Sequence, residues 1–119
     1  MEIGLIDAGL ESSIERDRWA AAEAAGELIA ERPWDAWGVV LRHGISSDED
    51  TRTAVATCVL EHLLESHFET FFPLLEAEIR GGQKLLADTF TRGWKFGEAE
   101  MPINSERWDK LVAELTRLE

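Results

Sequence analysis

The sequence predicts an all-α protein: a short α-solenoid of about three antiparallel helical hairpins, at residues 12–44, 48–80 and 83–118 of a single domain, 1–119. Apolar residues recur at three- and four-residue steps in one segment after another, which is the spacing of one helix face. The connections inside the pairs are very short, so paired helices must pack antiparallel. A period of 34–37 residues is typical of arrays of such pairs.

Residues 1–10 have no clear periodicity and contain two glycines, so we expect a loosely held lead-in. Ser12 or Ser13 is a suitable N-cap for an alanine-rich first helix. Pro33 ends that helix and is well placed to begin the next one. The second helix is closed by Gly44, and a histidine just before a helix end is expected to interact favourably with the last carbonyls, which is the role we assign to His43.

The central pair, 48–79, has the clearest pattern. Asp48 supplies an N-cap, and the first stripe consists of Val55, Cys58, Val59, His62 and Leu63. The second stripe runs from Phe68 to Ile79 and includes Leu74, and the glycine pair after Arg80 stops the helix. Pro73 removes a backbone donor inside this segment. We expect a kink or a break there; the alternative is that residues 68–72 form a separate turn.

The third pair follows the pattern less faithfully. Its first helix is expected at Gln83–Gly97, and Asn104 or Ser105 is the expected N-cap of its second helix. The clearest repeated feature is an aromatic anchor in each second helix, followed at +3 and +4 by two aliphatic residues. The three anchors are Trp37, Phe71 and Trp108, and we expect them in the core.

The first two units also align at a constant offset of 34 residues, which superimposes Arg18 on Arg52. Their first helices begin with an aspartate, an arginine and small residues: Asp17–Arg18 in one and Asp50–Thr51–Arg52 in the other. This pattern resembles HEAT-repeat proteins. The resemblance implies right-handed superhelical stacking, and it implies that these aspartates and arginines fasten neighbouring repeats.

Composition restricts the partners. Twenty-four acidic and twelve basic residues give a net charge of −12, which argues against nucleic acid because phosphate binding depends on lysine and arginine. No apolar run is long enough for a membrane span, and the N-terminus does not have the pattern of a signal peptide. One cysteine, Cys58, cannot form an internal disulfide and is expected to be an inert apolar side chain. We therefore expect a cytoplasmic chain.

The acidic residues are unevenly distributed. Residues 1–50 contain twelve acids and four bases, a net charge of −8, whereas residues 81–119 contain seven and six, a net charge of −1. The simpler explanation is solubility. The alternative is a basic protein partner that meets the acidic first half, with Glu23, Glu27 and Glu31 as the candidate contacts.

One polar cluster has the residue types of a metal site. Glu61, His62 and Glu65 lie within one helical turn of each other, so two or three ligands could converge. Some HEAT-like hydroxylases bind iron through repeated His–Glu pairs, but here the order is Glu–His and it occurs once. The alternative is a half-buried histidine beside a solvated edge of glutamates, and Glu69 extends that edge.

The segment Trp94–Lys95–Phe96 combines aromatic and basic side chains, as protein-binding hot spots do. The alternative is that the two aromatic rings cover the open end of the last repeat. Common catalytic motifs are absent. The sequence thus favours a non-catalytic protein-interaction module without a cofactor, with an immunity or antitoxin protein as a specific form, and a homodimer through one end of the array as a further expectation. A small metal-dependent enzyme using the cluster at residues 61–65 is the alternative.

Overall fold

The structure is a computed structural model that describes residues 1–117, and within this range it contains helices and no strand. This confirms the all-α class. The helices in chain order are α1 (Ile3–Leu10), α2 (Glu15–Glu27), α3 (Pro33–His43), α4 (Glu49–Val55), the π-helical turn η1 (Ala56–Leu60), α5 (Glu61–Ser66), α6 (Phe68–Arg80), α7 (Lys84–Thr91), the 3₁₀ turn η2 (Gly97–Glu100) and α8 (Pro102–Arg117). None of them is long and apolar enough to cross a membrane.

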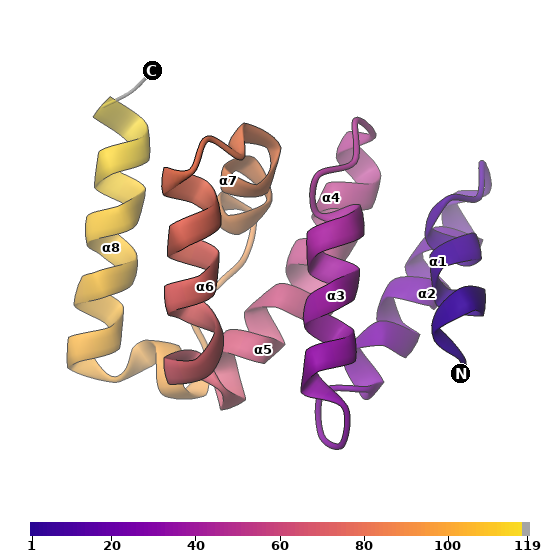
Figure 1. The fold of residues 1–119 in the computed structure, drawn as a ribbon, viewed down its shortest axis with the longest axis horizontal. Coiled ribbons are helices and arrows are strands. Elements are labelled where there is room, and N and C mark those ends of the chain that lie inside the picture. Colours follow the sequence, from indigo (N-terminus) through magenta and orange to yellow (C-terminus); the bar gives the residue numbers. More distant parts are fainter. Residues whose placement is uncertain (118–119) are drawn as a thin grey trace.

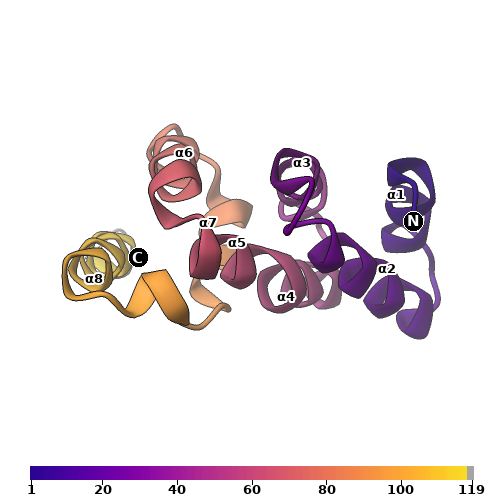
Figure 2. The ribbon, with the colours of Figure 1, turned by 90° about the horizontal axis from the view of Figure 1, so that it is seen from below.

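The helices form two rows. Figure 2 shows α1, α3 and α6 in one row and α2, α4 and α5 in the other. The α8 helix stands at one end of the molecule and α1 at the opposite end, so the chain progresses from one end to the other (Figure 1). Helices α4, η1 and α5 follow each other without a gap and pack against α2 on one side and α7 on the other.

The expectation of a loose lead-in at residues 1–10 is wrong, because Ile3–Leu10 is a helix packed on α2. Ile6 and Leu10 are buried, and a Cβ at Gly9 would lie 2.6 Å from the Cβ of Ala21, so the glycine permits this close approach. His43 does not simply cap α3. Its ring is buried, and Nε2 lies 2.7 Å from Oδ1 of Asp7, which ties α3 to α1.

Among the expected N-caps, Asp48 is right and the others are wrong, whereas Gly44 ends α3 as expected. Asp48 Oδ2 accepts the backbone N–H of Thr51 at 3.0 Å. The α2 helix begins only at Glu15, because the hydroxyl of Ser12 bonds to the N–H of Ile14 in the turn that precedes the helix.

The α6 helix is continuous through Pro73, so neither a break nor a separate turn at 68–72 is present. Pro73 lies in the second turn of the helix, where its missing N–H costs one hydrogen bond, and its side chain is exposed. The helix ends where expected. Gly81 caps it, and Gly82 has a φ of +105°, which an L side chain rarely adopts.

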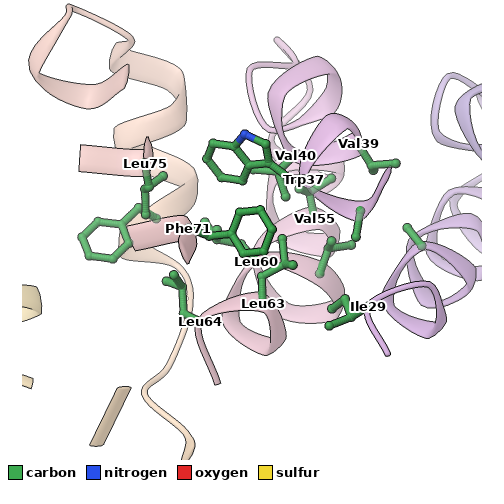
Figure 3. Packing of buried hydrophobic residues seen from close by; sticks show 14 of the residues in the cluster. Ile29, Trp37, Val39, Val40, Val55, Leu60, Leu63, Leu64, Phe71 and Leu75 are labelled. Carbon is green, nitrogen blue, oxygen red and sulfur yellow. The ribbon is translucent and has the colours of Figure 1, made fainter. Parts of the chain in front are cut away.

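The aromatic anchors are confirmed as core residues. Phe71 is completely buried, and Trp37 and Trp108 are each 6% exposed. Trp37 of α3 and Phe71 of α6 approach each other within one row, with ring centroids 5.6 Å apart, next to Leu60 and Leu63 of the central segment (Figure 3). Leu74, which the pattern placed on the apolar stripe, is instead 37% exposed.

Two arginines join α2 to α4 and α4 to α7 by the same set of bonds. Arg18 donates to Asp50 (2.9 Å) and to the carbonyl of Ser12 (3.1 Å). Arg52, 34 residues later, donates to Asp88 (3.0 Å) and to the carbonyl of Ser46 (2.8 Å). Three of the four residues implied by the resemblance therefore join neighbouring helices, and Asp88 is a fourth participant that the sequence pattern did not identify. Asp17 does not take part.

The C-terminal region differs most from expectation. The helix predicted at Gln83–Gly97 ends at Thr91, and α8 begins at Pro102, where proline fits the first helical position. Neither expected N-cap is used. Asn104 instead donates its side-chain N–H to the carbonyl of Glu98 at 2.9 Å, and this bond fixes the connection between the two helices.

Candidate functional site

The structure brings two predicted groups together, although they are about thirty residues apart in the sequence. The segment Gly93–Gly97 runs along α5, so Trp94–Lys95–Phe96 lies beside Glu61–His62 and Glu65. The connection between α7 and α8 is therefore part of the same surface as the polar cluster of the central segment.

Glu61 anchors this segment. Its Oε2 accepts the backbone N–H of Trp94 at 2.9 Å, and the residue is only 7% exposed. Glu61 is therefore not part of a solvated edge. Burial raises the pKa of its carboxyl group, while the hydrogen bond from Trp94 lowers it to a smaller extent.

His62 completes the attachment. Its Nδ1 lies 2.9 Å from Oε1 of Glu65, and its ring is stacked on Phe96 with centroids 6.2 Å apart and an angle of 11° between the planes. The imidazole is about half exposed, as expected for the alternative without a metal. A Cβ at Gly97 would lie 2.8 Å from the carbonyl oxygen of Glu65, so the chain passes the end of α5 at a distance that only glycine tolerates.

Trp94 points away from these anchors. It is 71% exposed, although its backbone is held by Glu61, and Phe96 is 38% exposed. Lys95 is not available as a free cation, because its Nζ bonds to Asp109 (2.6 Å) and to the hydroxyl of Ser105 (2.8 Å). The three residues predicted as one hot spot thus divide into two exposed aromatic rings and one lysine that holds α8.

The α2 helix packs on η1, the turn that directly precedes α5. A Cβ at Gly26 would collide with the backbone carbonyl of Cys58, so α2 and η1 cross in direct contact. The pKa of Cys58 is raised mainly by burial and, to a smaller extent, by the negative charges of Glu23 and Glu61. Glu23, Glu27 and Glu31 are exposed.

The structure does not bring the predicted metal ligands together in a suitable arrangement. Within residues 1–117, no three His, Cys, Asp or Glu side chains are grouped so that they could hold a metal ion. Glu61 uses one oxygen for the Trp94 backbone, and its other oxygen is 3.8 Å from His62 Nε2.

No family model matches the chain. No curated protein and no solved structure matches it either. A function must therefore rest on the side chains of this site.

Sequence reasoning named the residues of both groups but did not predict that the two groups lie together. The bond from Trp94 to Glu61 spans 33 residues, and helical spacing carries no information about it. The available signal was the pair of glycines that flank the aromatic segment. Gly93 packs on η1 with a hypothetical Cβ 3.6 Å from the carbonyl oxygen of Ala56, and Gly97 has a φ of +51°.

Proposed function

We propose that the chain is a non-catalytic protein–protein interaction module, built as a short HEAT-like α-solenoid of about three hairpins, that binds a basic partner protein. The binding surface, called here the acidic–aromatic surface, consists of Glu23, Glu27, Glu31, Glu65, Trp94 and Phe96. The repeated Arg18–Asp50 and Arg52–Asp88 bonds support the solenoid part of the proposal, since they join α2 to α4 and α4 to α7 in the same way.

One observation carries the binding part: Trp94 is largely exposed on a backbone that is fixed. A buried carboxylate holds its N–H, and the neighbouring Phe96 is stacked on His62. An aromatic ring presented in this way loses little conformational entropy when a partner covers it. Tryptophan is also among the residues most enriched in binding hot spots.

The charge of the surroundings favours a basic partner. An arginine or lysine side chain over the face of Trp94 would gain a cation–π interaction, and Glu65, which is bonded to His62, would add a negative charge nearby. The net charge of −12 would increase the rate of encounter with a positively charged surface. A protein that neutralises a basic toxin, as an immunity protein or antitoxin does, is the specific form that fits this chemistry.

Homodimerisation through the C-terminal end of the array has less support. The outward side of α8 exposes Glu106, Asp109 and Lys110, a charged face that would have to be desolvated.

The experiment begins with a pull-down from host lysate, followed by purification and titration of the protein that is retained. Trp94→Ala should weaken binding by about 30-fold, the effect of losing a hot spot worth about 2 kcal/mol. Trp34→Ala is the matched control, because Trp34 is 59% exposed on α3 in the other row. Reversing Glu23, Glu27 and Glu31 to lysine should lower the association rate, and reversing the exposed Glu78 on α6 should not.

Two results would contradict the proposal. One is a retained partner with an acidic surface. The other is equal loss of affinity in the Trp94 and Trp34 variants, which would place the binding surface elsewhere.

A further inference from the structure

A cavity in the C-terminal region lies apart from the acidic–aromatic surface. This cavity, of about 620 Å³, lies between three helices: its walls are the C-terminal end of α6, the helix α7 and the second half of α8. Trp108 closes the space between α7 and α8 on one side by packing against Phe90, with ring centroids 4.7 Å apart. Beyond that contact the cavity begins, and its apolar walls are formed by Ile79, Ala87, Leu111 and Leu115.

Four charged residues line the cavity, Arg80, Lys84, Asp88 and Glu114; their net charge is zero, but in the part of the chain that the structure describes only three of them are paired. Of the two carboxylates in the wall, Asp88 accepts bonds from Arg52 and Arg92, and Glu114 accepts both its bonds from Arg80. Each carboxylate is thus neutralised by an arginine. Lys84 also lines the cavity, and within residues 1–117 it takes part in no ion pair. Lys84 is therefore the one charged residue of the lining whose charge is unpaired within the described residues.

The size of the cavity fits a small molecule better than a peptide helix. Cavities that bind small ligands usually have volumes of about 300–1,000 Å³, with mostly apolar walls and a few polar groups that fix orientation. Two turns of an α-helix with side chains occupy roughly 900 Å³, given a diameter of about 10 Å and a length of about 11 Å. The cavity, at 620 Å³, could enclose only part of such a segment.

We propose that this cavity binds a small amphipathic anion, a molecule with an apolar body and one carboxylate or similar head group. The apolar body lies against Ile79, Leu111 and Leu115, and the head group lies at Lys84. Burying the body removes apolar surface from water on both molecules, which is the main driving force. The lysine selects the anionic head, because an unpaired ammonium group gains a charge-assisted hydrogen bond.

The test uses dodecanoate below its micellar concentration, titrated into the full chain by calorimetry. One molecule should bind per chain. Lys84→Glu should weaken binding by about tenfold, because the head group then faces a like charge. Lys110→Glu makes the same change of charge on the exposed side of α8 and should alter the affinity by less than about twofold. Dodecyltrimethylammonium has the same tail with a cationic head. It should bind the wild type no more tightly than dodecanoate binds the Lys84→Glu variant.

A second variant tests the cavity itself. Ala87→Phe fills part of the space and should abolish binding, and a cooperative thermal transition like that of the wild type shows that the variant is folded. The proposal is overturned by the absence of saturable binding, by equal affinity for the cationic amphiphile, or by equal effects of the two lysine variants. It is independent of the acidic–aromatic surface, since Trp94→Ala should leave dodecanoate binding unchanged.

Discussion

The central region, Glu49–Arg80, and the C-terminal region, Lys84–Arg117, share a sequence pattern but differ in how closely their helices pack. In the central region a single residue, His67, connects α5 to α6, and the three phenylalanines at positions 68, 71 and 72 are completely buried. In the C-terminal region residues 92–101 connect α7 to α8, and an open cavity separates parts of the two helices.

The difference shows that the length of the connection controls how closely two helices close, even where the aromatic anchor is retained. Trp108 is nearly as buried as Phe71, yet α8 leaves a cavity beside α7. The long connection also carries the two exposed rings of the acidic–aromatic surface. Stability is therefore expected to reside mainly in the central region, and binding features in the C-terminal region.

Among the tests of this division, Phe71→Ala should have the largest effect on stability. The ring is completely buried and contacts Trp34, Trp37 and His67, so its removal leaves a cavity between α3 and α6. We expect the free energy of unfolding to fall by about 3–5 kcal/mol. Urea denaturation followed by circular dichroism measures it, and the whole chain should unfold in one transition at lower urea.

Trp108→Ala provides the comparison. Its ring is also buried, but its removal should mainly release α8, which would appear as loss of exchange protection confined to residues 102–117. If both variants lose the same global stability in one transition, the two regions are a single cooperative unit and the division is wrong.

The next test breaks the junction between the regions. Arg52 is largely buried and bonds to both Ser46 and Asp88, so Arg52→Met should cost about 2 kcal/mol, the usual value for lost charge-assisted hydrogen bonds. Burial raises the pKa of Asp88, but hydrogen bonds from Arg92 and Arg52 outweigh it and hold the pKa below its usual 3.8. The stabilisation from this pair is thus complete above about pH 3.8 and lost as pH falls through the native-state pKa.

The difference in stability between wild type and Arg52→Met should therefore shrink as the pH is lowered below about 4. Denaturation at a series of pH values measures it. A difference that stays constant down to pH 2 would mean that Arg52 acts through packing of its aliphatic stem and not through its charge.

A smaller effect is expected from Arg107, which attaches α8 to the central region at the surface. Its guanidinium lies 5.5 Å from the ring centroid of Phe68 and 5.2 Å from that of Phe72, and it also pairs with Glu69 at 2.9 Å. Arg107→Ala should lower stability by about 1 kcal/mol. Lys110→Ala on the outer side of the same helix should have almost no effect, and equal losses would show that helix propensity alone is responsible.

How far the sequence predicted the molecule depends on whether the deciding contact is local. Helical spacing located the central helices, and the Asp48 cap depends on residues three apart, so both were predictable. The helix at Ile3–Leu10 was missed because Gly9 reads as a helix breaker until the close approach of Ala21 is known. The end of α7 at Thr91 and the join between Glu61 and Trp94 depend on contacts between distant residues, and no period in the sequence reports those.

The smallest expected change in stability concerns Glu61, the one carboxylate of the central region that holds the exposed segment of the C-terminal region. Burial raises the pKa of Glu61 above its usual 4.5, so the native state binds more protons than the unfolded chain just above that pH. Stability should therefore fall as pH rises through 4.5 to the native-state pKa. Glu61→Gln retains an oxygen that accepts the N–H of Trp94 and has no charge to bury. In this variant we expect no such decrease in stability between pH 4.5 and the native-state pKa of Glu61. Stability at pH 7 should be unchanged or higher by less than about 1 kcal/mol. The exposed Glu65→Gln should retain the fall, and loss of stability at pH 7 in Glu61→Gln would mean that the charge itself is needed to hold the Trp94 segment in place.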